Sequence, residues 1–341
     1  MLDKNIEKLK VLLNTSKHIL IIGHKNPDGD AVGSCMGWSF FLENLGHKTD
    51  VIMPNAYPEF LNWVPNQEKI ILYSQEKEKV KALIQDCDII FTLDFNDLSR
   101  VGHDFENDLK LAKKQFVMID HHQQPADYAD ITLSHPEYGS TAELVYDCID
   151  KMQYTDYINK DVASCLYLGI MTDTGSFKYP STRARTHYIA ANLIEKGAES
   201  SKIQQQTFDA SSFDRLKLLG LAMQNLEYLP EHKTAFIHLS QNELDDNNYE
   251  KGDTEGFVNY GLSIKGVVLA AIFKEDKIND IVKISLRSKG DFDVNQLART
   301  HFNGGGHVNA AGGKSDLSLD DTIEKFVNLL NVYKTQLNDA V

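Results

Sequence analysis

Short apolar runs alternate with segments of helical spacing through the first half of the chain. The runs suited to buried strands are His18–Ile22, Lys48–Met53, Asp88–Leu93 and Gln115–Ile119. Apolar residues recur at helical spacing in Ile6–Leu13, Ala31–Leu45, Glu76–Gln85, Thr141–Met152 and Asp161–Met171. Strands that alternate with helices in this way predict βαβ units, and therefore an α/β fold with a parallel sheet.

The pattern changes after about residue 182. Arg183–Tyr228 has helical spacing almost throughout, which predicts a helical connector. Beyond Pro230 the pattern predicts strands at Thr234–Leu239, Val267–Phe273 and Ile281–Arg287, and helices at Val294–Phe302 and Asp320–Tyr333. We therefore expect a parallel-sheet domain over residues 1–190, a connector over 191–229 and a smaller α/β domain over 230–341.

Composition and charge narrow the class of protein. The chain has 341 residues, 42% of them hydrophobic, and its formal net charge is −14. This size suggests two domains, and no apolar stretch approaches the roughly 18–20 residues of a membrane span. No secretory signal is visible at the N-terminus, so we expect a cytoplasmic protein without a membrane partner.

The negative charge also limits the nucleic acids that the protein can hold. Long nucleic acid is bound by many Lys and Arg side chains that neutralise phosphates, so a chain at −14 is not expected to bind a long duplex. A short polyanion remains compatible if a cation sits in the site. The cysteines are expected to be buried and reduced, because none is part of a C-x-x-C motif; they are Cys35, Cys87, Cys148 and Cys165.

The strongest local signal is the segment H-K-N-P-D-G-D, residues 24–30, which directly follows the apolar run His18–Ile22. In open α/β sheets, ligands bind just beyond the carboxyl ends of the strands. His24, Asp28 and Asp30 therefore lie where a site is expected. The alternative is a polar turn in which Asp30 caps the next helix.

The same pattern recurs three times. Apolar segments lead to Asp94, to the triplet Asp120-His121-His122, and to Asp173 after Gly169–Thr172. Parallel strands would bring all these ends to one edge of a sheet, where the carboxylates would repel one another unless a cation neutralised them. We therefore expect a metal site, with two ions. Mixed carboxylate and imidazole ligands suit Mn²⁺, Fe²⁺ or Co²⁺ better than Mg²⁺.

These four motifs together resemble the motifs of the DHH phosphoesterase superfamily. In the second half, the segment G-G-G-H-V-N-A-A-G-G, residues 304–313, is similar to the signature of the DHH-associated C-terminal domain. The resemblance spans nearly the whole chain and is greatest to the nano-RNase / pAp phosphatase branch. It implies hydrolysis of short oligoribonucleotides and of 3′-phosphoadenosine 5′-phosphate (pAp).

The resemblance also implies a role for each motif residue. His24 and Asp28 would bind one metal, Asp94 would bridge the two, and the other would be bound by Asp30, His121 and Asp173. Asp120 would orient its neighbours, and His122 would face the scissile phosphate, so that Asp94 and His122 are the expected catalytic residues. Two divalent ions are implied, with Mn²⁺ preferred and Mg²⁺ or Co²⁺ as alternatives.

Substrate binding is implied for a further set of residues: Arg100, Arg287, Gly304, Gly305, Gly306 and His307. Val308 stands where close relatives often carry a basic residue, so one minor substrate contact is expected to differ. Short RNA and small nucleotides are the expected partners, and a homodimer is consistent with the family.

Three alternatives remain open. The same two domains serve cyclic-dinucleotide and linear-dinucleotide phosphodiesterases, such as those that act on c-di-AMP or pApA. Pyrophosphatases and polyphosphatases share the N-terminal motifs but carry a different C-terminal domain, so the glycine–histidine motif argues against them. A non-catalytic nucleotide-binding regulator would be expected to have lost a metal ligand, and no ligand is missing here.

Overall fold

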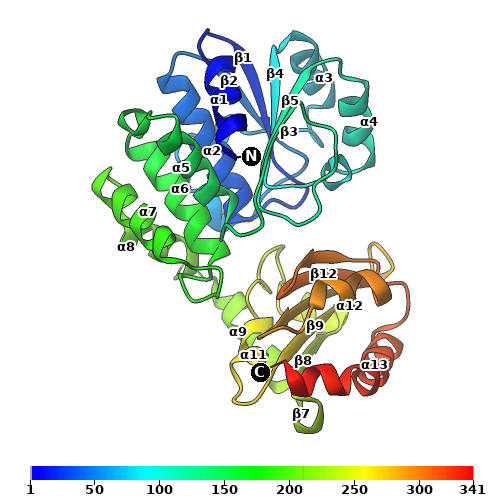
Figure 1. Cartoon of the computed structure of the whole chain (residues 1–341). Helices are drawn as coiled ribbons and strands as arrows, with labels where there is room; N and C mark the ends of the chain where they lie inside the picture. The colour runs from blue at the N-terminus through cyan, green and yellow to red at the C-terminus, as the bar shows by residue number, and fades with distance from the viewer. Residues whose placement is uncertain (1, 210, 341) are drawn as a thin grey trace. The chain divides into compact units, whose positions relative to one another are not determined.

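A computed structural model describes residues 2–209 and 211–340. The chain divides into two compact units, Met1–Ala210 and Ser211–Val341 (Figure 1). Among the described residues, none of the helices combines the length and the apolar character needed to cross a membrane.

The first unit is built on a six-stranded parallel sheet. Its strands are β1 (His18–Ile22), β2 (Lys48–Met53), β3 (Ile71–Leu72), β4 (Ile89–Leu93), β5 (Gln115–Asp120) and β6 (Ile131–Ser134). Their order is β3-β2-β1-β4-β5-β6, and every neighbouring pair is parallel. The predicted parallel sheet is confirmed, and it places the ends of β1, β4 and β5 side by side.

Helices cover both faces of this sheet (Figure 1). They are α1 (Leu2–Leu12), α2 (Gly29–Asn44), α3 (Lys77–Asp86), α4 (His103–Leu111), α5 (Thr141–Lys151) and α6 (Lys160–Asp173). Helices α7 (Ala184–Glu195) and α8 (Ser200–Phe208) pack outside this layer, against α6. Alternate residues of β1 join different cores, because successive strand side chains point to opposite faces. Ile19 and Ile21 pack with α2, α5 and α6, whereas Leu20 and Ile22 pack with α3 and α4.

Helices α2 and α6 approach each other closely because glycines line their contact. A Cβ added to Gly33 would lie 2.5 Å from the backbone oxygen of Cys165, and one added to Gly169 would lie 2.6 Å from Oδ1 of Asp30. The four cysteines are buried and free, as expected. Cys35, Cys148 and Cys165 belong to the core on this side of the sheet, where the glycine contact makes a close-packed support for the start of α2.

The helix predicted at Asp161–Met171 is confirmed as part of α6. The expectation that Asp173 lies at the end of a parallel strand is wrong, because Gly169–Thr172 is the last turn of α6 and Asp173 is the last residue of that helix. The helix is buried on all sides from Val162 to Met171. A helix that is apolar all round has no polar face, so its last turn resembles a buried strand in sequence.

The second unit is built on a mixed sheet. Its strands are β7 (Leu226–Leu229), β8 (Thr234–Leu239), β9 (Leu269–Asp276), β10 (Ile281–Ser288), β11 (Gly305–His307) and β12 (Ala310–Ser315). Their order is β11-β12-β10-β9-β8-β7, and only β8 and β9 pair in parallel among these described strands.

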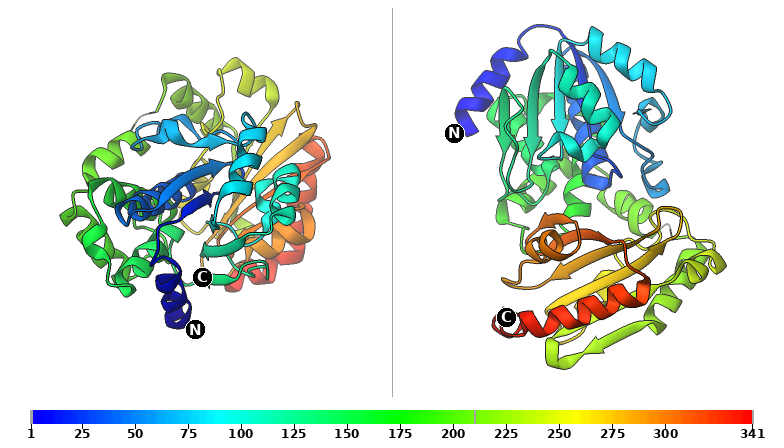
Figure 2. Two further views of the ribbon diagram at one scale, coloured as in Figure 1. Left: turned by 90° about the horizontal axis from the view of Figure 1, so that it is seen from above. Right: turned by 90° about the vertical axis from the view of Figure 1, so that its right-hand side faces the viewer.

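Helices also lie on both faces of the second sheet. Helices α12 (Val294–His301) and α13 (Leu319–Asp339) pack on one face, and α13 runs along that sheet in the right-hand view of Figure 2. Helices α9 (Phe213–Gln224), α10 (Gln241–Asp246) and α11 (Val258–Ser263) pack on the other face. The predicted connector 191–229 thus holds the end of α7 and all of α8, α9 and β7, and its proposed boundaries stay a prediction.

Candidate metal centre

Three adjacent strands of the first sheet deliver polar side chains at their carboxyl ends. His24 lies two residues beyond β1, Asp94 directly follows β4, and Asp120 ends β5 and precedes His121. Because β1, β4 and β5 are neighbours in the sheet, these side chains meet at one edge, as expected for a ligand site in an α/β fold.

Asp94 lies at the centre of this group and is only 2% exposed. Its Oδ2 is 3.4 Å from Nε2 of His24, and its Oδ1 is 3.6 Å from Nε2 of His121. Nδ1 of His122 is 3.8 Å from the same Oδ1. Within the described part of the first unit, Asp94 belongs to three sets of side chains whose ligand atoms lie within 4.8 Å of one another: His24, Asp28 and Asp94; Asp30, Asp94 and His121; Asp94, Asp120 and His122.

The backbone of Asp94 is itself unusual. Its φ is +66°, in the left-handed region that few residues other than glycine adopt. Non-glycine residues held in this region cost free energy and cluster at functional sites. The turn after β4 therefore holds the Asp94 carboxylate at the edge of the sheet at a cost in backbone strain.

Asp28 caps helix α2. Its Oδ1 accepts hydrogen bonds from the backbone N–H groups of Asp30 and Ala31, both at 3.0 Å. The alternative in which Asp30 caps the helix is therefore wrong, because Asp28 does so. The cap leaves Oδ2 of Asp28 3.9 Å from Nε2 of His24, so one oxygen of this carboxylate fixes the loop and the other faces the site.

Asp30 is held by the start of helix α5. Its two oxygens accept hydrogen bonds from the backbone N–H groups of Thr141 at 2.6 Å and Ala142 at 3.0 Å. The hydroxyl of Thr141 donates to Oδ1 of Asp94 at 2.8 Å. A helix N-terminus favours negative charge, so α5 supports two of the site's carboxylates. Ser140 caps α5 by accepting a hydrogen bond from the backbone N–H of Glu143, and the role of Thr141 was not predicted.

The histidines are oriented by backbone carbonyl groups. Nδ1 of His24 lies 3.0 Å from the backbone oxygen of Lys25, and Nδ1 of His121 lies 3.2 Å from that of Tyr138. Nε2 of His121 is 3.2 Å from Oδ2 of Asp173. A metal-binding histidine commonly donates its other ring N–H to a carbonyl or carboxylate, and both rings have that arrangement.

Asp120 contacts the third histidine. Its Oδ1 is 2.8 Å from Nδ1 of His122. Its Oδ2 is buried and has no hydrogen-bond partner among the described residues. This geometry would allow Asp120 to orient His122, and the unpartnered oxygen is one that a bound cation or water would satisfy.

Burial sets the protonation of these groups. Burial, and next the charge of Asp28, raise the pKa of Asp30 to about 7, and burial raises the pKa of Asp120 to about 6. Burial also raises the pKa of Asp94 well above its usual value. Burial also acts to raise the pKa of Asp28, but the charge of His24 and hydrogen bonds from backbone N–H groups together hold this pKa below its usual value. The carboxylates therefore resist ionising together without a cation.

The neighbouring histidines are held in the neutral form. Burial lowers the pKa of His121, and burial followed by the charge of His121 lowers the pKa of His122 far more. A neutral imidazole is the form that binds metal ions. Converging carboxylate oxygens and neutral imidazole nitrogens fit a divalent cation, so the donor set fits the expected metal.

Arg100 lies on the 3₁₀ turn Leu98–Val101 beside this edge. Its backbone oxygen accepts a hydrogen bond from the N–H of Lys25 at 2.9 Å, which ties the loop after β1 to this turn. Its side chain is exposed. Its charge is one of the influences on the pKa of His122, after burial and His121, so the guanidinium lies near the site.

The remaining predicted substrate residues lie in the second unit. Arg287 on β10 stands opposite Ala310 on β12, and Ala310 stands opposite His307 on β11. Two of the three glycines allow close backbone contact: a Cβ on Gly304 would lie 1.9 Å from the backbone oxygen of Gly312, and Gly306 has a φ of +152°.

Two N–H groups of the glycine loop are used inside this unit. That of Gly304 donates to the backbone oxygen of Ala298 at 3.2 Å, and that of Gly306 donates to Oδ1 of Asn295 at 2.9 Å. Asn295 was not singled out in the sequence, because nothing local marks an amide as the support of a distant loop. The contacts of Gly305 and of these two glycines with substrate stay a prediction.

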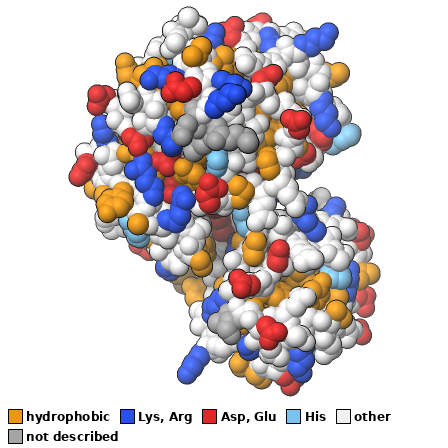
Figure 3. Space-filling model, viewed as in Figure 1, with side chains coloured by type: hydrophobic (Ala, Val, Ile, Leu, Met, Phe, Trp, Pro, Cys, Tyr) orange, Lys and Arg blue, Asp and Glu red, His pale blue; other side chains and the backbone are white. Residues whose placement is uncertain are grey.

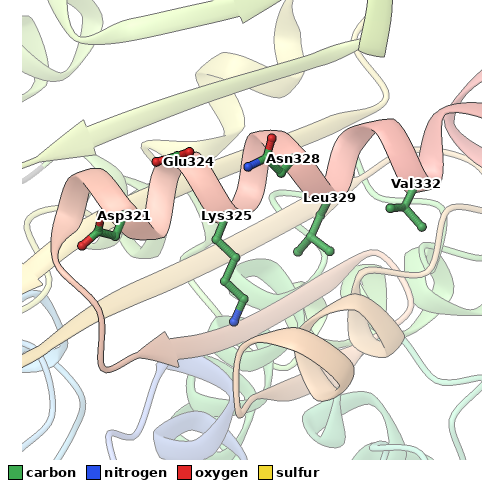
Figure 4. A pocket seen from close by; sticks show the side chains of 6 residues that line it. All are labelled: Asp321, Glu324, Lys325, Asn328, Leu329 and Val332. Carbon is green, nitrogen blue, oxygen red and sulfur yellow. The ribbon is translucent and has the colours of Figure 1, made fainter.

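A hollow of about 470 Å³ lies on the surface of α13 (Figure 4). It is lined by Asp321, Glu324, Lys325, Asn328, Leu329 and Val332. None of the predicted site residues lines it. On the face of the molecule drawn in Figure 3, acidic and basic side chains are interspersed rather than separated into single-sign fields.

Comparison with known proteins assigns both units. The profile of the "DHH family, N-terminal domain" matches residues 18–170, and that of the "DHHA1 domain" matches residues 234–336. A crystal structure of an exopolyphosphatase-related protein from Bacteroides fragilis is 39% identical, covers 98% of each chain and superposes with a TM-score of 0.94. The chain belongs to the DHH family.

Two curated relatives of this DHH protein are named for different activities. A probable bifunctional oligoribonuclease and PAP phosphatase NrnA from Streptococcus mutans is 28% identical over 317 residues, covering 93% of this chain and 95% of that protein. A cyclic-di-AMP phosphodiesterase GdpP from Geobacillus thermodenitrificans is 26% identical over 338 residues, covering 95% of this chain and 49% of that protein.

Proposed function

We propose that this DHH protein is a two-metal phosphoesterase that hydrolyses short oligoribonucleotides and pAp. The observation that carries the proposal is the position of Asp94, which is shared by three sets of carboxylate and imidazole ligands at one edge of the sheet. The Streptococcus mutans relative, which matches 93% of this chain, is named a probable bifunctional oligoribonuclease and PAP phosphatase NrnA. That name supports short oligoribonucleotides and pAp as the proposed substrates.

Two divalent ions, with Mn²⁺ preferred, would be held by the residues expected from the motifs. His24 and Asp28 would bind one ion, Asp94 would bridge, and Asp30, His121 and Asp173 would bind the other. Bound divalent ions supply a nucleophile by lowering the pKa of water, and they stabilise charge on the phosphate oxygens.

The chain's own groups position this chemistry. The start of α5 orients Asp30 and Asp94 through the N–H groups of Thr141 and Ala142 and the hydroxyl of Thr141. His122, whose Nδ1 lies 2.8 Å from Oδ1 of Asp120, would be oriented by that carboxylate towards the phosphate. A ring held in this way is suited to contact the phosphate or the leaving oxygen.

A second candidate is hydrolysis of a cyclic or linear dinucleotide. It is favoured by the similarity to GdpP, which extends over 95% of this chain. This chain covers only about half of that protein, so the similarity says less about the substrate. A non-catalytic nucleotide-binding regulator is the alternative of another class.

A hydrolysis panel with purified protein and Mn²⁺ tests the proposal. The substrates are pAp, a labelled RNA dinucleotide, a five-nucleotide RNA, cyclic-di-AMP, pyrophosphate and polyphosphate. We expect turnover of pAp and the short RNAs, and a loss of about 100-fold or more in Asp94→Asn. Asp86→Asn, at the exposed end of α3, is the matched control and should keep full activity.

Other outcomes would overturn the proposal in defined ways. A preference for cyclic-di-AMP would support the second candidate, hydrolysis of a dinucleotide. Turnover of pyrophosphate or polyphosphate alone would exclude both candidate functions. Full activity in Asp94→Asn would contradict the two-metal site. Metal binding without turnover of any substrate would favour the regulator.

A further inference from the structure

On one face of the second sheet, the described helices α9, α10 and α11 pack mainly against β8 and β9, and the outward side chains of β10 and β12 are more exposed. Side chains of β10 alternate between the α12–α13 core and this face: Val282, Ile284 and Leu286 are buried, whereas Lys283 is exposed and Arg287 is partly exposed. Strand β12 alternates in register, with Ala311 buried and its neighbours Gly312 and Lys314 exposed. The outward residues of β10 and β12 form what we term the open strip: Lys283, Ser285, Arg287, Ala310, Gly312 and Lys314.

The open strip carries like charges directly opposite each other. Lys283 pairs with Lys314 on β12 and with Lys274 on β9. Directly opposed side chains have Cβ atoms about 4.5–5.5 Å apart, and like charges in such pairs are destabilising. A row of three lysines across adjacent strands therefore costs stability unless an anion neutralises it.

Only part of this charge is neutralised within the unit. Lys283 forms an ion pair with Asp276 at 2.5 Å. Lys274 donates from Nζ to the hydroxyl groups of Tyr249 at 2.6 Å and Thr254 at 3.1 Å, and burial lowers its pKa to about 8. Lys314 forms no ion pair within the described part of the chain. Its charge remains available to a ligand.

Between its charged ends, the open strip carries small residues. Ser285 faces Gly312, and Arg287 faces Ala310. A Cβ added to Gly312 would meet only the backbone oxygen of Ile284, at 3.7 Å. Lys283 and Arg287 are four residues apart on one strand, a separation of about 13 Å. Cations at both ends of an open floor suit an extended chain that carries more than one phosphate.

We propose that the open strip binds the phosphodiester backbone of a short oligoribonucleotide, with the Lys283–Lys314 pair contacting a phosphate beyond the nucleotide held at Arg287. The inference rests on the proposed function and deepens it, because it names what selects substrates longer than a mononucleotide. The small number of cations on the strip limits the number of phosphates contacted, so short rather than long chains are bound.

The test compares two substrates in matched charge variants. Lys283→Gln with Lys314→Gln removes the pair, and Lys314→Gln alone removes a charge that has no ion-pair partner among the described residues. Lys334→Gln makes the same charge change at an exposed position on α13, which covers the opposite face of the sheet. We measure kcat/KM for pAp and for a five-nucleotide RNA at two salt concentrations, with circular dichroism to check folding.

We expect kcat/KM for the RNA, relative to that for pAp, to fall about ten-fold in the double variant and about three-fold in Lys314→Gln. The slope of log(kcat/KM) for the RNA against log[salt] should become shallower by about 0.7 per lost contact. Lys334→Gln should change neither. An unchanged RNA-to-pAp ratio in the folded double variant would overturn the inference while leaving the proposed function intact.

A binding measurement separates the two proposals if turnover fails. Fluorescence anisotropy with a labelled five-nucleotide RNA reports affinity without chemistry. If the unaltered protein binds this RNA but does not cleave it, the proposed function fails. The inference then stands if the double variant binds about ten-fold more weakly, and falls if affinity is equal or if the unaltered protein does not bind.

Discussion

Asp94 is buried, has a left-handed backbone conformation and faces the rings of three histidines. Each property alone has a structural explanation, such as a turn or a satisfied ion pair. Their combination at the end of a central strand does not, because burial and strain both oppose folding unless the carboxylate gains a partner. A divalent cation is the partner that balances both costs.

This arrangement predicts how Asp94→Asn changes stability with pH in the presence of a chelator. The folded-state pKa of Asp94 is raised far above the usual 3.8, chiefly by burial. The folded protein then binds a proton that the unfolded chain has lost, so this group's stabilisation is present at low pH and is lost as pH rises. Asparagine mimics the protonated form, tolerates positive φ and can still accept the hydrogen bond of Thr141.

Thermal unfolding of both proteins between pH 5 and pH 8 checks this prediction. In chelator, the variant should melt a few degrees above the unaltered protein at pH 8, and the gap should narrow towards pH 5. In Mn²⁺ the order should reverse at pH 8, because asparagine removes a metal ligand. A gap that is independent of pH would show that Asp94 does not carry the raised pKa.

The packing of α2 against α6 links two parts of the site. Helix α2 begins beside Asp28 and Asp30, and α6 ends at Asp173. Their separation is set by Gly33 and Gly169, where a Cβ would meet atoms at 2.5 and 2.6 Å. A change at this contact is therefore expected to reach the proposed metal ligands at the ends of both helices.

Gly33→Ala should destabilise the protein by about 1–3 kcal/mol through overpacking, and it should also weaken metal binding. Denaturant unfolding and titration with Mn²⁺ measure the two effects. Gly220→Ala is the matched control, because it lies in α9 with nothing within 4 Å of an added Cβ. It should be neutral or should stabilise by up to about 1 kcal/mol. Equal effects of the two substitutions would contradict the role of the contact.

At the scale of elements, long apolar runs were predictable and short or polar ones were not. The bounds of β1, β2 and β8 match the predicted runs, because each contains a short stretch of consecutive apolar residues of the kind that forms a buried strand. Strands β3 and β11 were missed, since two or three residues carry no period. The predicted metal ligands meet because β1, β4 and β5 are neighbours, an order that follows from packing and not from local pattern.

Both tryptophans of the molecule lie in the first unit. Trp38 is buried in its core and Trp63 packs against that core. Tryptophan fluorescence therefore reports the unfolding of the metal-binding unit, whereas circular dichroism reports both units. The two signals together separate the stability of one unit from that of the other.

Mn²⁺ at about 100 times its dissociation constant should stabilise the first unit by about 2.7 kcal/mol. The urea midpoint seen by fluorescence should then rise by roughly 1 M. The part of the circular dichroism change that comes from the second unit should keep the same urea midpoint. Transitions that coincide in both signals and move together would show that the two units unfold as one cooperative body.

The outer strands of both sheets have a consequence for self-association. The first sheet ends on one side at β3, which has two residues, and on the other at β6, where Asn5 of α1 donates a hydrogen bond to the backbone oxygen of Thr132. The second sheet ends at β11 and β7, of three and four residues. Long unpaired strands template aggregation between copies of a protein. Neither sheet offers one, so this fold resists intermolecular β-pairing even when the protein is concentrated.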